Sequence, residues 1–197
     1  MARTAGSHAQ TTAPKVKAAA LTLFSRHGYA AVSMRQIAAE VGVQAGALYT
    51  YTPDKQTLLF SLMHDHMTEL LAEWGQFVCE TDPLARLMGF VRCHLDYHLP
   101  RREAVFISYM ELRNLNEENF ATIENLRKSY EDRLEEIVQT GMTQGVFLVS
   151  DSKIATMAVI GLLKETSTWY RPDGRLSAAQ LVEIYQKMVL QVLGAHI

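Results

Sequence analysis

The chain has 197 residues, of which 48 % are hydrophobic and 20 % charged, a composition that fits a packed globular protein and excludes a disordered one. Its net charge of −2 is unevenly divided: residues 1–55 carry six basic and two acidic side chains, whereas residues 56–197 carry 13 basic and 19 acidic ones. A basic N-terminal part on an acidic remainder suggests that only the N-terminal part binds a polyanion.

The ends of the chain and its cysteines bear on location. Residues 1–12 lack the apolar segment of a signal peptide and are expected to form a flexible arm. No apolar run approaches the ~20 residues that a membrane helix needs. Cys79 and Cys93 are too few for a disulfide framework and are expected to be buried thiols in a reducing compartment. We therefore expect a cytoplasmic protein.

Apolar residues recur every three to four positions along almost the whole chain, which predicts helices throughout. The first helix is expected from Pro14 to His27, and the second starts at Ser33, where Gln36 completes a capping box. Gly42 ends the second helix, and a short third one is expected at 44–51. Longer helices are expected near 55–77, 83–99, 102–112, 117–144, 151–169 and 178–193. The sequence thus predicts an all-α protein of about nine helices.

The second and third helices, joined at Gly42, have the pattern of a helix-turn-helix, whose second helix enters the major groove of DNA. The small residues Ala45, Gly46 and Ala47 would let the backbone approach the bases, which explains a glycine that costs ~1 kcal/mol inside a helix. Gln44 is expected to read a base directly. The other expected DNA contacts are Ser33, Arg35, Tyr49, Thr50, Tyr51 and Lys55. Alternatively, both tyrosines pack inward and the small residues only allow close helix contact.

The residues AAALTLFSRHGYAAVSMRQIAAEVGVQAGALYTYTPDKQTLL carry a family resemblance. With Phe24-x-x-x-Gly28-Tyr29, Leu48-Tyr49 and Lys55 at their present spacing, the segment from Lys15 to Leu59 resembles the DNA-binding domain of the TetR family of bacterial regulators. The chain departs from the family pattern at Ala47, often Thr or Ser, and at Thr52, usually aromatic. The resemblance implies a helix-turn-helix DNA-binding domain at 13–60 and a helical ligand-binding and dimerisation domain at 61–197. It also implies that the long helix from Lys55 connects the two.

The last two expected helices carry apolar residues on more than one face, which predicts that a partner chain covers them. In the TetR family these two helices form a four-helix dimer bundle. The alternative is that both are ordinary core helices. The expected homodimer interface consists of Ile154, Met157, Ala158, Gly161, Leu162, Leu181, Tyr185 and Met188.

Aromatic residues and methionines of the middle helices predict an adaptable apolar ligand pocket, although each could instead be plain core. Its expected lining consists of Trp74, Met88, Phe90, Phe106, Tyr109, Met110 and Trp169. The stretch TSTWYRPDGRLSA, at 166–178, is similar to one found in TetR-family regulators of sterol and fatty-acid catabolism. That similarity implies an acyl-coenzyme A thioester or a related hydrophobic effector, and hence a repressor released from a palindromic operator.

Two alternatives stay open at this point. His94 and His98, four residues apart on one expected helix, could bind a metal ion and make the chain a metal-sensing regulator. An all-α dimeric scaffold without DNA contacts is the other alternative, but it leaves the basic N-terminal part unexplained. HExxH, P-loop, GxGxxG and GxSxG motifs are absent from the sequence, so we expect no enzyme, no cofactor and no resident metal.

Overall fold

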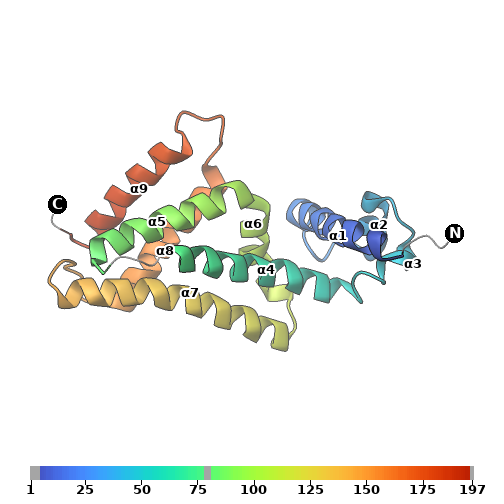
Figure 1. Cartoon of the computed structure of the whole chain (residues 1–197), viewed down its shortest axis with the longest axis horizontal. Helices are drawn as coiled ribbons and strands as arrows, with labels where there is room; N and C mark the ends of the chain where they lie inside the picture. Colours follow the sequence, from blue (N-terminus) through green and yellow to red (C-terminus); the bar gives the residue numbers. More distant parts are fainter. Residues whose placement is uncertain (1–4, 78–80, 196–197) are drawn as a thin grey trace. The chain divides into compact units, whose positions relative to one another are not determined.

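The computed structural model describes residues 5–77 and 81–195, and their side chains from residue 12 onward. Every regular element in these ranges is helical, which confirms the predicted all-α fold (Figure 1). None of the described helices is long and apolar enough to cross a membrane. The helices are α1 (Ala5–His27), α2 (Met34–Val41), α3 (Ala45–Leu48), α4 (Lys55–Gln76), α5 (Pro83–His98), α6 (Arg102–Met110), α7 (Glu117–Thr143), α8 (Ser152–Trp169) and α9 (Ala178–Val192), with 3-10 turns η1 (Leu99–Arg101) and η2 (Leu112–Asn114).

The described residues form two compact units. The first unit contains 5–66 and 103–123, and the second contains 67–77, 81–102 and 124–195. The segment 103–123, which holds α6 and the start of α7, therefore belongs to the same unit as the helix-turn-helix. The sequence-based division at residue 60 places this segment in the other part, and that division stays a prediction.

The first helix begins earlier than predicted. α1 starts at Ala5 and not at Pro14, so residues 5–12 of the expected flexible arm are helical. Pro14 lies inside the helix, where it lacks an N–H and one backbone hydrogen bond to the preceding turn is lost. The alanines at 5, 9 and 13 favour helix strongly enough to continue it on the N-terminal side. Residues 1–4 of the expected arm, like Cys79, lie outside the described residues.

Capping residues set the bounds of α2, as the sequence predicts. The Ser33 hydroxyl accepts from the Gln36 N–H at 3.3 Å, and the Gln36 side chain accepts from the Ser33 N–H at 2.8 Å. Gly42 ends the helix with φ 79°, a left-handed conformation that glycine adopts without strain. α3 is shorter than the expected 44–51, because Gln44 is its N-cap and Tyr49 its C-cap.

Buried apolar side chains hold the helix-turn-helix together. Phe24 of α1, Ile37 of α2, Leu48 of α3 and Leu59 of α4 are all fully buried. Thr52, which replaces the usual aromatic residue, is also buried, and its hydroxyl donates to the Asp54 carbonyl at 3.0 Å. The turn before α4 is therefore packed and hydrogen-bonded without an aromatic ring.

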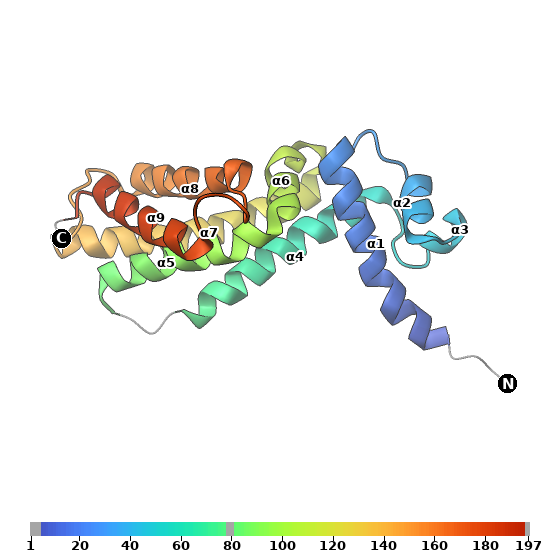
Figure 2. The same ribbon diagram turned by 90° about the horizontal axis from the view of Figure 1, so that it is seen from above.

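The second unit is a helical bundle in which α5, α8 and α9 pack against one another, as both views show (Figures 1 and 2). Its core includes Phe90 of α5, Leu134 of α7, Val159 of α8 and Val182 of α9. Gly141 of α7 is required here, because an added Cβ would lie 2.1 Å from the Phe147 ring. Cys93 is a free, buried thiol within this core.

Candidate functional site

The exposed side chains of α3 and its flanking residues make few contacts within the protein. The Gln44 side chain is exposed and makes no capping hydrogen bond, and Tyr49 is 55 % exposed. A Cβ added at Gly46 would meet no described atom within 4 Å outside its own stretch of backbone. Ala47 is exposed and Ala45 half-buried. This surface is therefore open to the approach of another molecule.

The remaining predicted DNA contacts around α3 differ from one another in exposure and in the hydrogen bonds that they make within the protein. Arg35, in the first turn of α2, is exposed, as a phosphate contact requires. The hydroxyls of Ser33 and Thr50 make local bonds: Ser33 caps α2, and Thr50 donates to the Ala47 carbonyl at 2.7 Å. Tyr51 is half-buried, so the expectation that it faces fully outward is only partly met.

Lys55 differs from the sequence-based expectation of a cation directed at phosphate. Its ammonium group donates to the carbonyls of Tyr29 and Val32, both at 2.8 Å, and lies 4.2 Å from the centroid of the Tyr29 ring. Two of its three N–H donors are therefore used inside the protein. The main structural role of Lys55 is to hold the loop between α1 and α2, and its phosphate contact stays a prediction. Nothing in the residue pattern indicates the two carbonyl acceptors.

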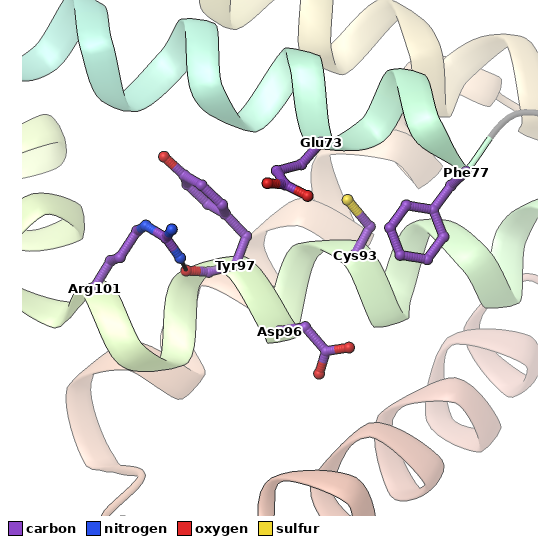
Figure 3. A pocket seen from close by; sticks show the side chains of 6 residues that line it. All are labelled: Glu73, Phe77, Cys93, Asp96, Tyr97 and Arg101. Atoms are coloured by element: carbon purple, nitrogen blue, oxygen red, sulfur yellow. Dashed lines mark hydrogen bonds between the residues drawn. The ribbon is translucent and has the colours of Figure 1, made fainter.

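The second unit contains a cavity of about 260 Å³ at the facing sides of α4 and α5 (Figure 3). Cys93 lines this cavity. Burial, together with the charges of Glu73 and Asp96, raises the pKa of the Cys93 thiol to about 12, so the thiol is uncharged at neutral pH. Arg101 lies 4.1 Å from the centroid of the Tyr97 ring, a cation–π contact. The lining residues are Glu73, Phe77, Cys93, Asp96, Tyr97 and Arg101.

Hydrogen bonds fix one wall of this cavity. The Tyr97 hydroxyl donates to the Glu69 carboxylate at 3.1 Å, and burial and this negative charge raise the pKa of Tyr97. The Arg101 guanidinium donates to the Tyr97 carbonyl at 3.0 Å. Sequence reasoning missed the cavity, because acidic residues on a helix resemble an ordinary solvated face.

Two residues of the predicted apolar pocket, Trp74 and Phe90, pack together in the core of the second unit, and the pocket itself stays a prediction. Trp74 and Phe90 are buried and pack edge to face at 5.3 Å, and Phe90 stacks on Tyr130 at 4.9 Å. Trp74 also stacks on Phe77, which connects this aromatic cluster to the cavity wall.

The other predicted pocket residues are more dispersed. Met88 is half-buried, and Trp169 is exposed and stacks on Tyr185. Phe106, Tyr109 and Met110 lie on α6 in the first unit, where Phe106 and Met110 are exposed.

His94 and His98 form a buried ring pair. Their rings stack at 4.1 Å, Nδ1 of His98 lies 2.7 Å from the His94 carbonyl, and Nδ1 of His94 lies 3.1 Å from the Tyr130 hydroxyl. Burial lowers the pKa of His98 to about 4, against a smaller opposing effect of the His94 carbonyl. Within 5–77 and 81–195, no group of three or more His, Cys, Asp or Glu side chains is placed to hold a metal ion. The arrangement gives no support to the metal-sensing alternative.

Two family models match the chain. Residues 17–62 match the model described as bacterial regulatory proteins, tetR family, and residues 80–193 match the Tetracyclin repressor-like C-terminal domain. The second match alone spans more than half of the 197 residues. The chain belongs to the TetR family.

Relatives and solved structures agree with this assignment. The HTH-type transcriptional repressor KstR2 of Mycolicibacterium smegmatis is 27 % identical over 177 residues, covering 87 % of this chain and 85 % of that protein. A tetR-family regulatory protein from Rhodococcus RHA1 has a TM-score of 0.88 at 27 % identity, covering 94 % of this chain and 98 % of that one. AibR, solved in complex with isovaleryl coenzyme A and operator DNA, has a TM-score of 0.84 at 25 % identity, covering 94 % and 100 %.

Helices α8 and α9 of this TetR-family chain expose much of the predicted dimer surface. Ile154 is 68 % exposed, and Met157, Ala158, Gly161 and Met188 are exposed as well, with Leu162 half-buried. A groove of about 470 Å³ runs beside Ile154. Further exposed apolar residues, which sequence reasoning missed, are Leu148, Ile184 and Val192.

Two residues of the predicted dimer surface lie elsewhere. Leu181 and Tyr185 belong to the hydrophobic core of the chain itself, where each is more than nine-tenths buried. They leave little area for a partner chain, because they occupy the inner face of α9, whereas Ile184 and Met188 occupy its outer face. Leu181 and Tyr185 are therefore core residues of the single chain, and their part in a dimer interface stays a prediction.

Proposed function

We propose that this chain is a repressor that binds a palindromic operator as a homodimer and is released by a hydrophobic acyl-thioester effector. The KstR2 relative is named as a transcriptional repressor, and the AibR structure contains both operator DNA and isovaleryl coenzyme A. In this role the protein binds DNA and effector and catalyses no reaction. It acts in the cytoplasm, where duplex DNA and coenzyme A thioesters meet.

The glycine at position 46 is the main support for the proposal that α3 contacts DNA. The residue is exposed, has no positive φ, and has open space where a Cβ would be, so the fold itself does not require glycine there. A backbone that must approach the floor of the major groove does require it, because a side chain would hold the helix away from the bases. Gln44 and Tyr49 flank this position with exposed side chains.

Selection of duplexes from a random library tests this role of α3. The unmodified protein should enrich a palindrome whose half-sites lie about one DNA turn, ~34–36 Å, apart. Gln44→Ala should flatten the preference at one base pair of each half-site, at a cost of ~1–3 kcal/mol, while keeping the others. The matched control is Gln139→Ala, an exposed glutamine on α7, which should leave the selected sequence unchanged. A base preference that survives Gln44→Ala contradicts direct reading by this side chain.

The exposed face of α8 and α9 supports the homodimer. Ile154, Met157 and Met188 lie on the surface of helices that otherwise pack into the bundle core. Apolar side chains gathered on two adjacent helices are typical of protein–protein interfaces, because their burial is favourable. A second copy of the chain would cover this face in the same way on both sides of a twofold axis.

The aromatic cluster of the second unit supports an apolar effector. A ligand that displaces Phe77 at the cavity wall would next meet Trp74 and Phe90, which offer ring faces to an acyl chain. Thermal unfolding with acyl-coenzyme A esters, free fatty acids and aromatic acids tests the class of effector. We expect the acyl thioesters to raise the unfolding temperature, since they bind the folded state only.

A matched pair of variants tests the route into the second unit. Phe77 and Phe120 are both 39 % exposed, but only Phe77 lines the cavity. Phe77→Ala should therefore change the thermal shift given by acyl thioesters, and Phe120→Ala should not. Equal shifts in both variants would place the effector elsewhere.

A further inference from the structure

A buried carboxylate ties the segment after α6 to the helix-turn-helix. Glu111 is 7 % exposed, and its Oε1 accepts from the backbone N–H of Tyr29 at 3.2 Å. Its Oε2 accepts from the side-chain amide of Asn114 at 2.5 Å. All three residues belong to the first unit, although Glu111 and Asn114 are far from Tyr29 in the sequence. The carboxylate therefore bonds to two different segments at once.

Gln56, in the first turn of α4, makes a second link to the same segment. Its Nε2 donates to the Asn114 carbonyl at 2.8 Å, and its Oε1 accepts from the Asn116 N–H at 3.2 Å. The side-chain amide thus pairs with the backbone of 114–116 as another peptide group would. Its Nε2 also reaches the Tyr29 hydroxyl at 3.4 Å. Tyr29 is the common member of both links.

The loop that receives these bonds directly precedes α2. Tyr29 packs edge to face on Phe24 at 5.3 Å, and Lys55 holds the carbonyls of Tyr29 and Val32. The residue after Val32 is Ser33, the N-cap of α2, so the loop sets where α2 begins. A shift of this loop would move Arg35 and, through the Gly42 turn, α3.

We propose that Glu111 and Gln56 are positioning residues that hold the loop between α1 and α2 in the conformation that binds the operator. This inference rests on the proposed function, because it concerns how the DNA-reading surface is held. The segment 103–123 continues at both of its ends into the second unit. A change of the second unit that pulls on α6 or α7 therefore reaches Tyr29 through Glu111 and Asn114.

The chemistry of the link suits a contact that forms and breaks. It consists of two hydrogen bonds to the Glu111 carboxylate and two between Gln56 and the backbone of 114–116, and breaking them costs little free energy where water can replace the lost partner. A buried apolar contact would resist such a change more strongly, because its separation exposes area to water. Glu111 and Gln56 thus hold the loop through contacts that can break and form again.

Three variants test the positioning role by fluorescence anisotropy with the selected operator duplex. Glu111→Ala leaves the Tyr29 N–H and the Asn114 amide without their acceptor, and it should weaken operator binding roughly tenfold. Glu111→Gln should restore binding to within about twofold, since its amide can still accept from Tyr29 and donate to an Asn114 amide turned by ~180°. Val105→Ala is the control for lost stability, as Val105 is buried on α6 and makes none of these bonds.

Amide hydrogen exchange gives a readout that does not depend on DNA binding. In the unmodified protein the Tyr29 N–H should exchange slowly, and Glu111→Ala should accelerate it while the core amides of α7 stay protected. The inference is overturned if the Tyr29 amide exchanges as fast as an exposed loop amide in the unmodified protein. It is also overturned if Glu111→Ala binds the operator as tightly as the unmodified protein does, or no more weakly than Val105→Ala. Failure of the unmodified protein to bind any duplex would instead contradict the proposed function.

Discussion

Gly46 on α3 has neither of the usual structural reasons for a glycine. Its φ is not positive, and an added Cβ would meet no described atom within 4 Å beyond its own backbone stretch. Gly46→Ala should therefore leave the free energy of unfolding of the free protein unchanged or raise it by up to ~1 kcal/mol, and the unfolding temperature should follow. Operator affinity should fall, because in the proposed complex the new methyl group would face the bases.

Thermal unfolding and anisotropy on the same protein samples check this prediction. Gly42→Ala is the informative comparison, since Gly42 has φ 79° and an alanine there is strained, at a cost of ~1–2 kcal/mol. Gly42→Ala should lower stability, whereas Gly46→Ala should lower DNA binding alone. Unchanged operator affinity in Gly46→Ala would remove the main residue-level support for DNA contact by α3.

The buried His98 predicts acid sensitivity. Its pKa is lowered from 6.5 to about 4 in the folded protein, first by burial and also by the nearby Arg101 charge. The unfolded chain therefore takes up a proton that the folded chain does not, so stability falls as pH drops from about 6.5 to about 4, by at most ~1.4 kcal/mol per pH unit. Urea unfolding at pH 7 and at pH 5 measures this loss in the free energy of unfolding. His98→Phe should flatten the difference, while His27→Gln, at an exposed histidine, should preserve it.

Single residues also show where sequence reasoning reached its limit. The exposure of Gln44 and the left-handed cap at Gly42 could be predicted, because both depend on local pattern. The two carbonyl acceptors of Lys55 and the bond from Glu111 to Tyr29 could not, since they join segments distant in sequence. Hydrophobic spacing carries no information about such polar partners.

Helix α8 offers the sharpest test at the scale of elements. Gly161 is exposed, and an added Cβ would meet no described atom within 4 Å outside the local helix backbone. Gly161→Glu should therefore leave the single chain folded but dissociate the proposed homodimer, because an unpaired charge buried at an interface costs several kcal/mol, about 3–5. Light scattering should give a dimer for the unmodified protein and a folded chain of 22.2 kDa for the variant. A dimeric Gly161→Glu would place the interface on another face.

The capped ends of α2, α5 and α9 were easier to predict than the faces of the helices. The capping boxes Ser33–Gln36 and Ser177–Gln180 are both present, and Pro83 starts α5 after Asp82, as local sequence rules require. The inner and outer faces of α9 were harder, because Leu181 and Tyr185 are as apolar as Ile184 and Met188. Only the packing of the other helices decides which pair meets the core.

For the molecule as a whole, the helical periodicity was enough to predict the all-α class, whereas the DNA-binding N-terminal part was predicted from the helix-turn-helix pattern, the uneven charge and the resemblance to the TetR family. The grouping of 103–123 with the helix-turn-helix was not predictable, because it depends on contacts made after the chain returns from residues 67–102. The cavity at the facing sides of α4 and α5 was missed for a different reason: its acidic lining residues, Glu73 and Asp96, resemble parts of ordinary solvated helix faces.

An anisotropy titration shows whether an effector controls the binding of this protein to its operator. A labelled duplex carrying the selected palindrome is first bound by the unmodified protein, and acyl-coenzyme A esters of increasing chain length are then added. We expect saturable release by at least one ester, with operator affinity lowered about 5- to 150-fold, and no release by coenzyme A alone. A complex that stays bound with every ester, or a protein that binds no duplex more tightly than random DNA, would contradict this expectation.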